Sequence, residues 1–420
     1  MDTSPRMDTS PRMDVAAYLY PWDVVGDPAA AEMVAGLGLD HVTLAAVYHS
    51  VRALTPRHPR HRVVVAEHTA AYYPLSTQRW EGAPLHPPRP AWTGGTDSFG
   101  AAVGALRAAG VGVHAWAVIN HVDLPGHAEF AVTSAYGDRY PWTLCPAQDT
   151  VREYAVGLAG DLADLPGITG VELESFGWYG FDHLSAHDKV SGVRLTGAEQ
   201  YLFSLCFCAG CDRGYRAGGI DPAELRMRVR DRLDPVFAGE PRPAPPAGSA
   251  DPAGPAPPAQ PADEAAAIDA LLGAELAAAV KAMRDTVAER YRAVVVERIR
   301  SARPDLAVLA HASPQAHRYL AFTGLDATRA GIFDGLVVNC WQGTEVLSAT
   351  LATGTEVPVL ASLLAVDGMG GRPDTLAEQG VAALAAGAAG LRVYHAGLAD
   401  RAGLEHIREL TQTVAKGAEQ

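Results

Sequence analysis

Residues 170–180 read Gly-Val-Glu-Leu-Glu-Ser-Phe-Gly-Trp-Tyr-Gly, a pattern that predicts a buried strand carrying two acids, Glu172 and Glu174. Side chains alternate along a strand, so both carboxylates point to the same side. Strands buried on both faces are normally runs of Val, Ile and Leu, and a buried carboxylate is costly. A solvated edge strand is the alternative, which these apolar neighbours disfavour: Ile168, Val171, Leu173 and Phe176. In a parallel barrel, Glu174 would lie at the carboxyl end of its strand, where such barrels keep their chemistry.

Seven more apolar runs of strand length lie before and after this one, separated by stretches of helical composition. They are residues 15–22, 41–49, 111–119, 306–311, 335–341, 358–364 and 390–395. Eight strand–helix units in alternation are typical of a closed parallel barrel. An open doubly wound sheet would more often show a glycine-rich phosphate loop after the first strand, where this chain has Tyr-Pro-Trp-Asp at residues 20–23. We therefore predict an α/β fold, a (β/α)8 TIM barrel, with no organic cofactor.

The chain divides into four parts by composition. Residues 1–14 contain a duplicated Met-Asp-Thr-Ser-Pro-Arg hexapeptide and are expected to be disordered. Residues 15–237 are expected to form the first part of the barrel, with strands one to four and a cysteine-containing insertion after the fourth. Within them, residues 50–96 show too little periodicity for a regular element and are interpreted as a long functional loop. Residues 238–263, rich in Pro, Ala and Gly, are expected to form a disordered linker, and residues 264–416 the second part of the barrel.

Composition and charge narrow the classes of partner. The 420 residues carry 48 Asp and Glu against 34 Lys and Arg, a net charge of -14, with no block of clustered basic residues. Nucleic acid is therefore disfavoured as a partner. No apolar run has the length of a membrane span, and the N-terminus lacks the pattern of a secretion signal, so we expect no membrane partner and a cytoplasmic location. The expected partner is a small-molecule or oligosaccharide substrate, and a homo-oligomer is compatible with the sequence.

Polar and aromatic residues end or follow most of the predicted strands. A parallel barrel brings the carboxyl ends of its strands to one mouth, so these side chains are expected to converge there. Such a group is what a pocket for a sugar or another polar small molecule requires. The candidate substrate-binding residues are Trp22, Asp23, His49, Asn120, His121, Trp178, His311, Asn339, Trp341, Tyr394 and His395.

Three thiols fall within six residues, at Cys206, Cys208 and Cys211, a spacing suited to one tetrahedral metal ion. Cys145, in a Cys-Pro pair after the third predicted strand, is the candidate fourth ligand, whereas Cys340 is interpreted as a buried thiol. We expect a structural zinc ion that supports the insertion, because the insertion shows little apolar periodicity of its own. Reduced cysteines packed as small apolar side chains are the alternative.

The region from Leu144 to Tyr215 resembles the middle of the family-42 β-galactosidases and of related, uncharacterised glycosidase-like barrels. The resemblance implies that the Cys-Pro and Cys-x-Cys-x-x-Cys segments supply a zinc site. It also implies that the strand between them carries the acid/base Glu, here Glu174. The chain departs from the family at two places: Leu173 stands where the family has Asn, and the seventh predicted strand lacks the family's nucleophilic Glu. Asp367, just after that strand, is the candidate second acid.

These observations favour a glycoside hydrolase-like enzyme that acts on a carbohydrate or sugar-containing small molecule. Glu174 would donate a proton to the leaving oxygen, with Asp367 as the second catalytic acid and Glu172 as a neighbouring charge that raises the pKa of Glu174. A lyase or isomerase is one alternative, in which a histidine of the mouth transfers the proton: His49, His121, His311 or His395. A non-catalytic sugar-binding barrel is another, and a metal-dependent hydrolase using His183 and His187 is a third.

Overall fold

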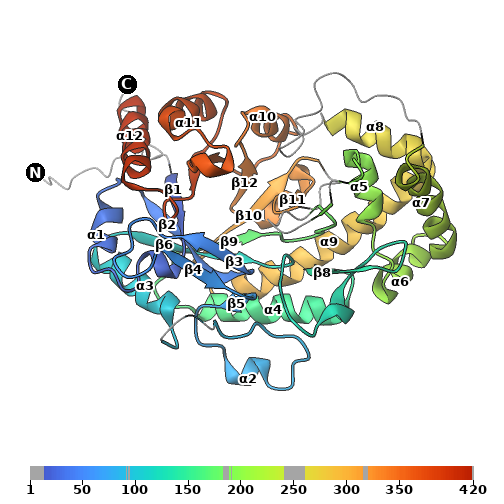
Figure 1. Cartoon of the computed structure of the whole chain (residues 1–420), viewed down its shortest axis with the longest axis horizontal. Helices are drawn as coiled ribbons and strands as arrows, with labels where there is room; N and C mark the ends of the chain where they lie inside the picture. Colours follow the sequence, from blue (N-terminus) through green and yellow to red (C-terminus); the bar gives the residue numbers. More distant parts are fainter. Residues whose placement is uncertain are drawn as a thin grey trace, which may run out of the picture.

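The computed structural model describes residues 14–90, 92, 95–182, 189–190, 192–240, 261–315 and 320–418. Eight parallel strands form its centre (Figure 1). In chain order they are β1 (Asp14–Leu19), β2 (His41–Tyr48), β6 (Gly112–Val118), β9 (Gly170–Glu174), β10 (Ala307–Ser313), β12 (Gly335–Asn339), β13 (Val359–Leu364) and β14 (Gly390–Tyr394). β1 pairs with β2 on one side and with β14 on the other, so the sheet closes on itself. The predicted TIM barrel is confirmed, and each predicted run coincides with one strand.

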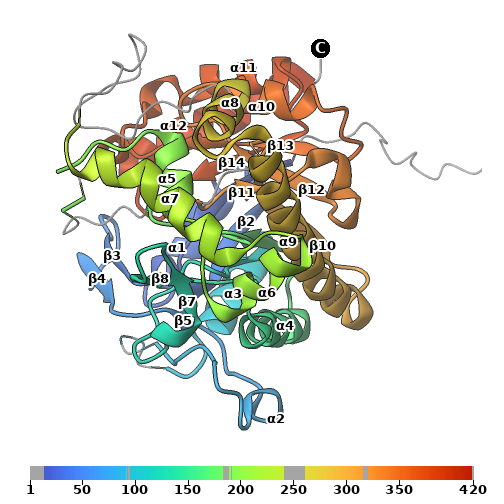
Figure 2. The same ribbon diagram turned by 90° about the vertical axis from the view of Figure 1, so that its right-hand side faces the viewer.

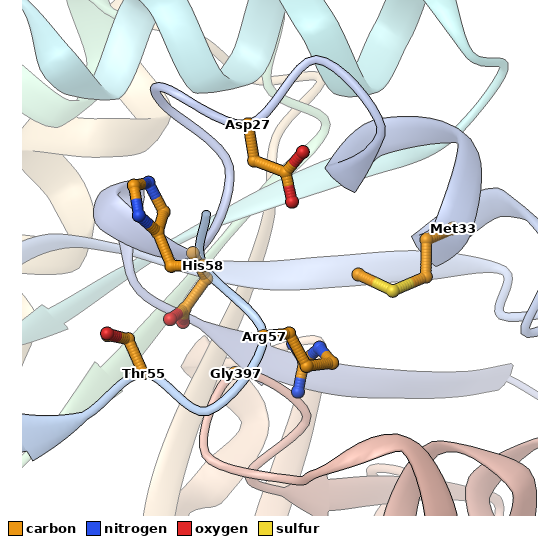
Figure 3. Close-up of a pocket in the computed structure, with 7 residues that line it drawn as sticks. Asp27, Met33, Thr55, Arg57, His58 and Gly397 are labelled. Carbon is orange, nitrogen blue, oxygen red and sulfur yellow. The ribbon is translucent and has the colours of Figure 1, made fainter. Parts of the chain in front are cut away.

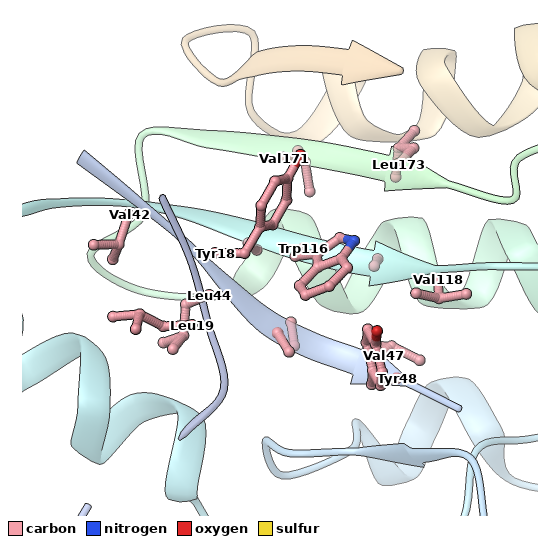
Figure 4. Packing of buried hydrophobic residues seen from close by; sticks show 14 of the residues in the cluster. Tyr18, Leu19, Val42, Leu44, Val47, Tyr48, Trp116, Val118, Val171 and Leu173 are labelled. Carbon is pink, nitrogen blue, oxygen red and sulfur yellow. The ribbon is translucent and has the colours of Figure 1, made fainter. Parts of the chain in front are cut away.

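Helices cover the outside of this barrel. They include α1 (Ala30–Ala35), α3 (Ser98–Ala108), α4 (Asp149–Asp164), α9 (Ala274–Ala302), α10 (Glu345–Leu351), α11 (Leu376–Ala385) and α12 (Arg401–Ala418). Alternate strand residues face these helices, and Leu19, Val42 and Leu44, each at most 1% exposed, gather on one side of β1 and β2 (Figure 4). Because the other side of each strand faces the barrel interior, both faces are buried, which explains the continuous apolar runs.

A second apolar core lies beside the barrel. It is formed by the hairpin of β7 (Ala131–Thr133) and β8 (Arg139–Leu144), by the N-terminal half of α9, and by four further helices that lie together in Figure 2. These are α5 (Gly197–Phe203), α6 (Ala209–Ala217), α7 (Pro222–Phe237) and α8 (Pro261–Leu272). On α7, Leu225, Val229 and Leu233 form one fully buried face. The expectation that the insertion shows little apolar periodicity is therefore wrong. Arginines stand between these positions in the sequence, but the apolar residues repeat every four positions and share one face of the helix.

The expectation that residues 50–96 lack regular elements is also wrong. They contain the hairpin of β3 (Val51–Leu54) and β4 (Val63–Ala66), the two-residue strand β5 (Ala70–Ala71), and the short helix α2 (Thr77–Trp80). β5 pairs antiparallel with the end of β2. In the β3–β4 hairpin, Ala53 and Val64 face inward from opposite strands, while Leu54 and Val63 are exposed. Strands of four residues give too few alternations to be recognised from sequence.

Some predictions concern residues that the structure does not describe. Residues 1–13 and 241–260, which hold the hexapeptide repeat and most of the predicted linker, lie outside the described residues, as do His183 and His187. In the described ranges, no helix is both long enough and apolar enough to cross a membrane.

Candidate active site in the barrel

Glu174 is the last residue of β9, and only 8% of it is exposed. The indole N–H of Trp116, on neighbouring β6, donates to Glu174 Oε2 at 2.9 Å, and Nδ1 of His311, on β10, lies 3.5 Å from the same oxygen. Burial raises the pKa of the Glu174 carboxyl and the Glu172 charge adds to this, while His311 and the Trp116 hydrogen bond oppose it. Ser175 follows in the left-handed region with a φ of 50°, so the strand stops directly after Glu174. The result is a carboxyl that keeps its proton to higher pH than a solvated glutamate, as a general acid requires.

Glu172, two residues earlier, is fully buried and has a different set of partners. Arg392 Nε on β14 donates to Glu172 Oε1 at 2.6 Å, and the Thr43 hydroxyl donates to the same oxygen at 3.0 Å. Burial alone would raise the pKa of Glu172. The charge of Arg392, with hydrogen bonds from His114, His311 and His41, outweighs burial and holds that pKa well below its usual range. Glu172 is therefore an ionised partner of Arg392, and the effect of its charge on the pKa of Glu174 is small beside that of burial.

Two histidines lie beside this ion pair. The rings of His41 and His114 stack at 3.8 Å, and their nitrogens lie within 4.8 Å of a Glu172 oxygen, close enough to share a metal ion with it. The Arg392 guanidinium is already bound to Glu172 Oε1, however, and would repel a divalent cation there. Arg392 Nη2 also contacts Asp14 at 2.8 Å. We interpret these side chains as an ion-pair network that ties β1, β2, β6, β9 and β14 together.

Tyr18 of β1 connects the surroundings of the two acids. Its hydroxyl donates to Glu172 Oε2 at 3.2 Å and lies 3.0 Å from His311 Nε2. A continuous chain of polar contacts therefore runs from Glu174 through His311 and Tyr18 to Glu172 and Arg392.

Aromatic rings surround the same end of the barrel. Tyr20 stacks on Trp22 at 4.4 Å and on His395 at 4.3 Å, and Trp341 lies 5.2 Å from Tyr394. Burial, with the charge of Arg57, holds the pKa of His395 well below its usual value, so this imidazole is neutral. The structure thus brings together four of the predicted mouth residues: Trp22, Trp341, Tyr394 and His395.

Asp23 lies in η1 (Pro21–Asp23), directly after β1, and borders a small cavity. Arg57, His58 and Gly397 also line this cavity (Figure 3). The cavity measures about 10 Å³, room for one water and no sugar ring. Burial raises the pKa of Asp23 to about 7, against the hydrogen bond from the Tyr20 N–H and the charge of Arg57. Asp23 is thus a second buried carboxyl at this end of the barrel.

Two other predicted mouth residues form a separate group. His49 and His121 lie against each other at 4.1 Å, and His121 stacks on Tyr179 at 4.6 Å. Asn120, by contrast, supports the backbone, because its amide donates to Gly177 O at 2.5 Å and its oxygen accepts from the Tyr291 hydroxyl at 2.6 Å.

The remaining predicted residues lie in three different settings. The Trp341 backbone N–H donates to Asn339 Oδ1 at 2.8 Å. Trp178 belongs to the core of the insertion, where its indole donates to Arg284 O at 3.0 Å. Asp367 begins the short 3₁₀ helix η4 (Asp367–Met369) after β13 and is exposed.

Sequence reasoning missed several residues of the site: Tyr18, Tyr20, Trp116, Arg392, and Tyr48 of β2, whose hydroxyl accepts from that of Tyr20 at 3.3 Å. A signal existed for most of them, because Tyr18 with Tyr20 and His114 with Trp116 repeat at i and i+2 within apolar runs, as the two acids do. Arg392 is likewise a lone cation in the apolar run Gly-Leu-Arg-Val-Tyr.

The four predicted cysteines come together outside the barrel. Cys145 follows β8, and Cys206, Cys208 and Cys211 lie at and just before the start of α6. The sulfur of Cys145 is 3.5 Å from that of Cys211 and 3.6 Å from that of Cys208, and all four sulfurs lie within 4.8 Å of one another. A tetrahedral metal with bonds of about 2.3 Å places its sulfurs about 3.8 Å apart, so the cluster is compatible with a metal site. Cys340 lies apart from this cluster, in the core of the barrel.

No protein family model matches the sequence, and no curated protein matches it. Among solved structures, the glycoside hydrolase domain of PgaB (BpsB) from Bordetella bronchiseptica is similar with a TM-score of 0.57 at 14% identity, over 95% of this chain and 99% of that one. The catalytic domain of β-amylase from Paenibacillus polymyxa gives 0.54 at 10% identity, over 97% and 99%. A GH42 β-galactosidase from G. stearothermophilus gives 0.52 at 11% identity, over 98% of this chain and 57% of that one. The chain therefore has the barrel fold of glycoside hydrolases, GH42 β-galactosidases among them, which confirms the predicted resemblance.

Proposed function

We propose that the protein is a glycoside hydrolase-like enzyme that acts on a carbohydrate or a sugar-containing small molecule, with Glu174 as the proton donor. The observation that carries the proposal is the Glu174 carboxyl, buried at the end of β9, bound by an indole N–H and raised in pKa. Such a carboxyl keeps its proton to higher pH than a solvated glutamate does and can pass it to a leaving oxygen. The fold shared with glycoside hydrolases supports this proposal. For the second catalytic acid we propose Asp367, the acid that follows β13.

A panel of aryl glycosides and short oligosaccharides tests this function. We expect at least one of them to be cleaved, and NMR of the anomeric proton during cleavage then shows whether configuration is retained or inverted. Binding of a sugar without cleavage of any member would instead support a non-catalytic sugar-binding barrel.

One observation supports the alternative hypothesis of a lyase or isomerase: Nδ1 of His311 lies 3.5 Å from Glu174 Oε2. A histidine beside a carboxyl is also the arrangement of a proton-transfer pair. A product with a new carbon–carbon double bond, or an isomer of the substrate, would identify this class in the same assays.

We propose in addition that Cys145, Cys206, Cys208 and Cys211 hold one structural zinc ion. The four sulfurs supply the donor set that zinc prefers. Backbone N–H groups of Thr133 and Cys208 donate to Cys206 Sγ at 3.3 and 3.4 Å, as expected around a thiolate ligand. An ion there would connect Cys145, which follows β8, to the start of α6.

Metal analysis checks the zinc site. Protein purified without chelators should contain about one zinc per chain, and Cys208→Ser should lose it and unfold at lower temperature, because binding energy of a structural zinc contributes to folding. Cys340→Ala is the matched control, since Cys340 lies outside the cluster, and it should keep its zinc. Less than about half an equivalent in the wild type, or full zinc in Cys208→Ser, would contradict the assignment.

A further inference from the structure

The hydrogen bonds around His311 fix which of its nitrogens carries hydrogen. The Tyr18 hydroxyl has one hydrogen and donates it to Glu172 Oε2 over 3.2 Å. Toward His311 the Tyr18 oxygen is therefore an acceptor, so Nε2 of His311, 3.0 Å away, carries a hydrogen. Glu172 Oε2, 3.7 Å from the same nitrogen, favours this assignment. In a neutral imidazole Nδ1 is then bare.

That bare nitrogen faces Glu174. Nδ1 lies 3.5 Å from Glu174 Oε2 and has no hydrogen-bond partner among the described residues. If Glu174 were ionised and His311 neutral, two lone pairs would face each other in a buried place, which is costly. A hydrogen between the two atoms removes the conflict, whether it is bonded to the oxygen or to the nitrogen.

The local charges lead to the same result. Glu172 is already balanced by Arg392, whose Nε lies 2.6 Å from its carboxylate. The pair of Glu174 and His311 is neutral only when it holds one proton, and a buried site favours the neutral state.

We infer that Glu174 and His311 keep one proton between Oε2 and Nδ1, and that the proton exchanged with a substrate is a second one on Glu174 Oε1, which gives the pair a positive charge and is therefore held less tightly than the first. Trp116 and His311 both contact Oε2, and Oε1 makes no hydrogen bond within the described ranges, so Oε1 is the oxygen available to a substrate. His311 is then a positioning residue that acts through Glu174. The role of Oε1 rests on the proposed function, whereas the shared proton does not depend on it.

During hydrolysis, Glu174 passes its Oε1 proton to the leaving oxygen. The Oε1–H bond of Glu174 breaks, an O–H bond forms on the leaving oxygen, and the substrate C–O bond breaks with its electron pair on that oxygen. Glu174 becomes a carboxylate, and the Nδ1–H of an imidazolium at His311 compensates the new charge. The water that adds to the sugar carbon supplies the proton that returns to Oε1.

Other titratable and charged groups face this pair from the surrounding elements. They are Tyr18 of β1, Tyr48 of β2, Glu172 of β9, Tyr179 after β9, and Arg392 and Tyr394 of β14. Burial raises the pKa of each of these tyrosines, so all four stay neutral near pH 7, and Glu172 and Arg392 compensate each other. The ¹⁵N signals of the His311 ring therefore report on the pair.

NMR of the full-length protein with ¹⁵N-labelled histidine rings tests the shared proton without a substrate. The chain has 15 histidines, and the His311 signals are identified by their loss in His311→Gln. We expect Nε2 to carry a hydrogen and Nδ1 to show the intermediate ¹⁵N shift of a nitrogen that shares a proton with a carboxyl. In Glu174→Gln the Nδ1 signal should move to that of a bare nitrogen, because an amide has no acidic proton to share. A bare Nε2, or an Nδ1 signal that Glu174→Gln leaves unchanged, would overturn the inference.

The pH profile of His311→Gln tests the second part. The substitution keeps a polar amide near Tyr18 but removes the ring nitrogen that faces Glu174. With the compensating cation gone, the maximal rate on a substrate of the wild type should fall roughly 10²-fold. The alkaline limb of kcat/KM should rise by about one pH unit or more, because Glu174 then holds its own proton longer.

His114→Gln is the matched control, because His114 contacts Glu172 and is not joined to Glu174 by any hydrogen bond or ion pair between described residues. It removes a buried histidine and should leave the alkaline limb in place. Equal shifts in both variants, or no shift in His311→Gln, would refute the positioning role in an enzyme that is still active. If the wild type cleaves no glycoside, the proposed function fails, and the NMR experiment still decides on the shared proton.

Discussion

Replacing Glu174 by Gln is expected to lower turnover by roughly 10²- to 10⁴-fold, the loss typical of removing one general acid. The amide keeps the shape of the side chain, and its oxygen still accepts from the Trp116 indole, but it has no proton to donate. Because an ionisable group in an apolar setting costs stability, the free energy of unfolding should stay the same or rise. The measurements are kcat/KM across the pH range on the substrate that the wild type cleaves, and urea unfolding of both proteins.

The control for this experiment is Glu199→Gln. Glu199 is also a buried glutamate, but it caps α5 in the insertion, where its carboxylate accepts from the Thr196 N–H at 2.7 Å, and a glutamine can do the same. Its activity should match the wild type. If Glu174→Gln keeps more than about a tenth of wild-type activity at every pH, a loss well short of that expected for a general acid, the active acid is not on β9. The histidine-based lyase or isomerase would then be the better hypothesis.

The barrel was predictable from sequence because its strands are buried on both faces and therefore appear as continuous apolar runs. The same rule does not find the β3–β4 hairpin, whose alternate residues are exposed, or the core of the insertion, whose helices each bury only one face. The four-residue strands of the hairpin are too short to show a period, and arginines interrupt the apolar positions of α7 in the sequence.

The candidate site was predictable only in part, and for a related reason. The alternation of side chains places Glu172 and Glu174 on one side of β9, and cysteine spacing brings four thiols together. Nothing in the strand itself shows that Glu172 pairs with Arg392, 220 residues later, or that Tyr18 meets His311, 293 residues later. The closure of the barrel creates both contacts, and they distinguish two similar carboxyls: Glu172 is an ionised structural group, and Glu174 is a candidate acid with a raised pKa.

The ion pair of Glu172 and Arg392 leads to the largest expected effect on stability. Arg392→Met is expected to lower the free energy of unfolding by about 3–5 kcal/mol at neutral pH, the range found when one partner of a buried ion pair is removed. Methionine fills much of the space, so the main cost is the charge of Glu172, which is fully buried and loses its cation. Urea unfolding of both proteins at several pH values measures this loss of stability.

The pH dependence of this stability loss shows whether the unpaired charge of Glu172 causes it. In the variant, burial dominates and the pKa of Glu172 in the folded state lies above its unfolded value of about 4.3. The loss of stability relative to the wild type is therefore smaller near pH 4, where the folded variant takes up a proton on Glu172, and grows as the pH rises toward 7. Arg292→Met is the matched control, because Arg292 is 5% exposed and hydrogen-bonds to the carbonyls of Phe176 and Gly324 without a carboxylate partner within 4.0 Å in the described ranges. Its loss of stability should not depend on pH over this range.

The double variant Glu172→Gln/Arg392→Met should recover part of the stability that Arg392→Met loses, since no unpaired charge is left behind. A loss below about 1 kcal/mol, or one equal at pH 4 and pH 7, would show that Glu172 is not held ionised by Arg392.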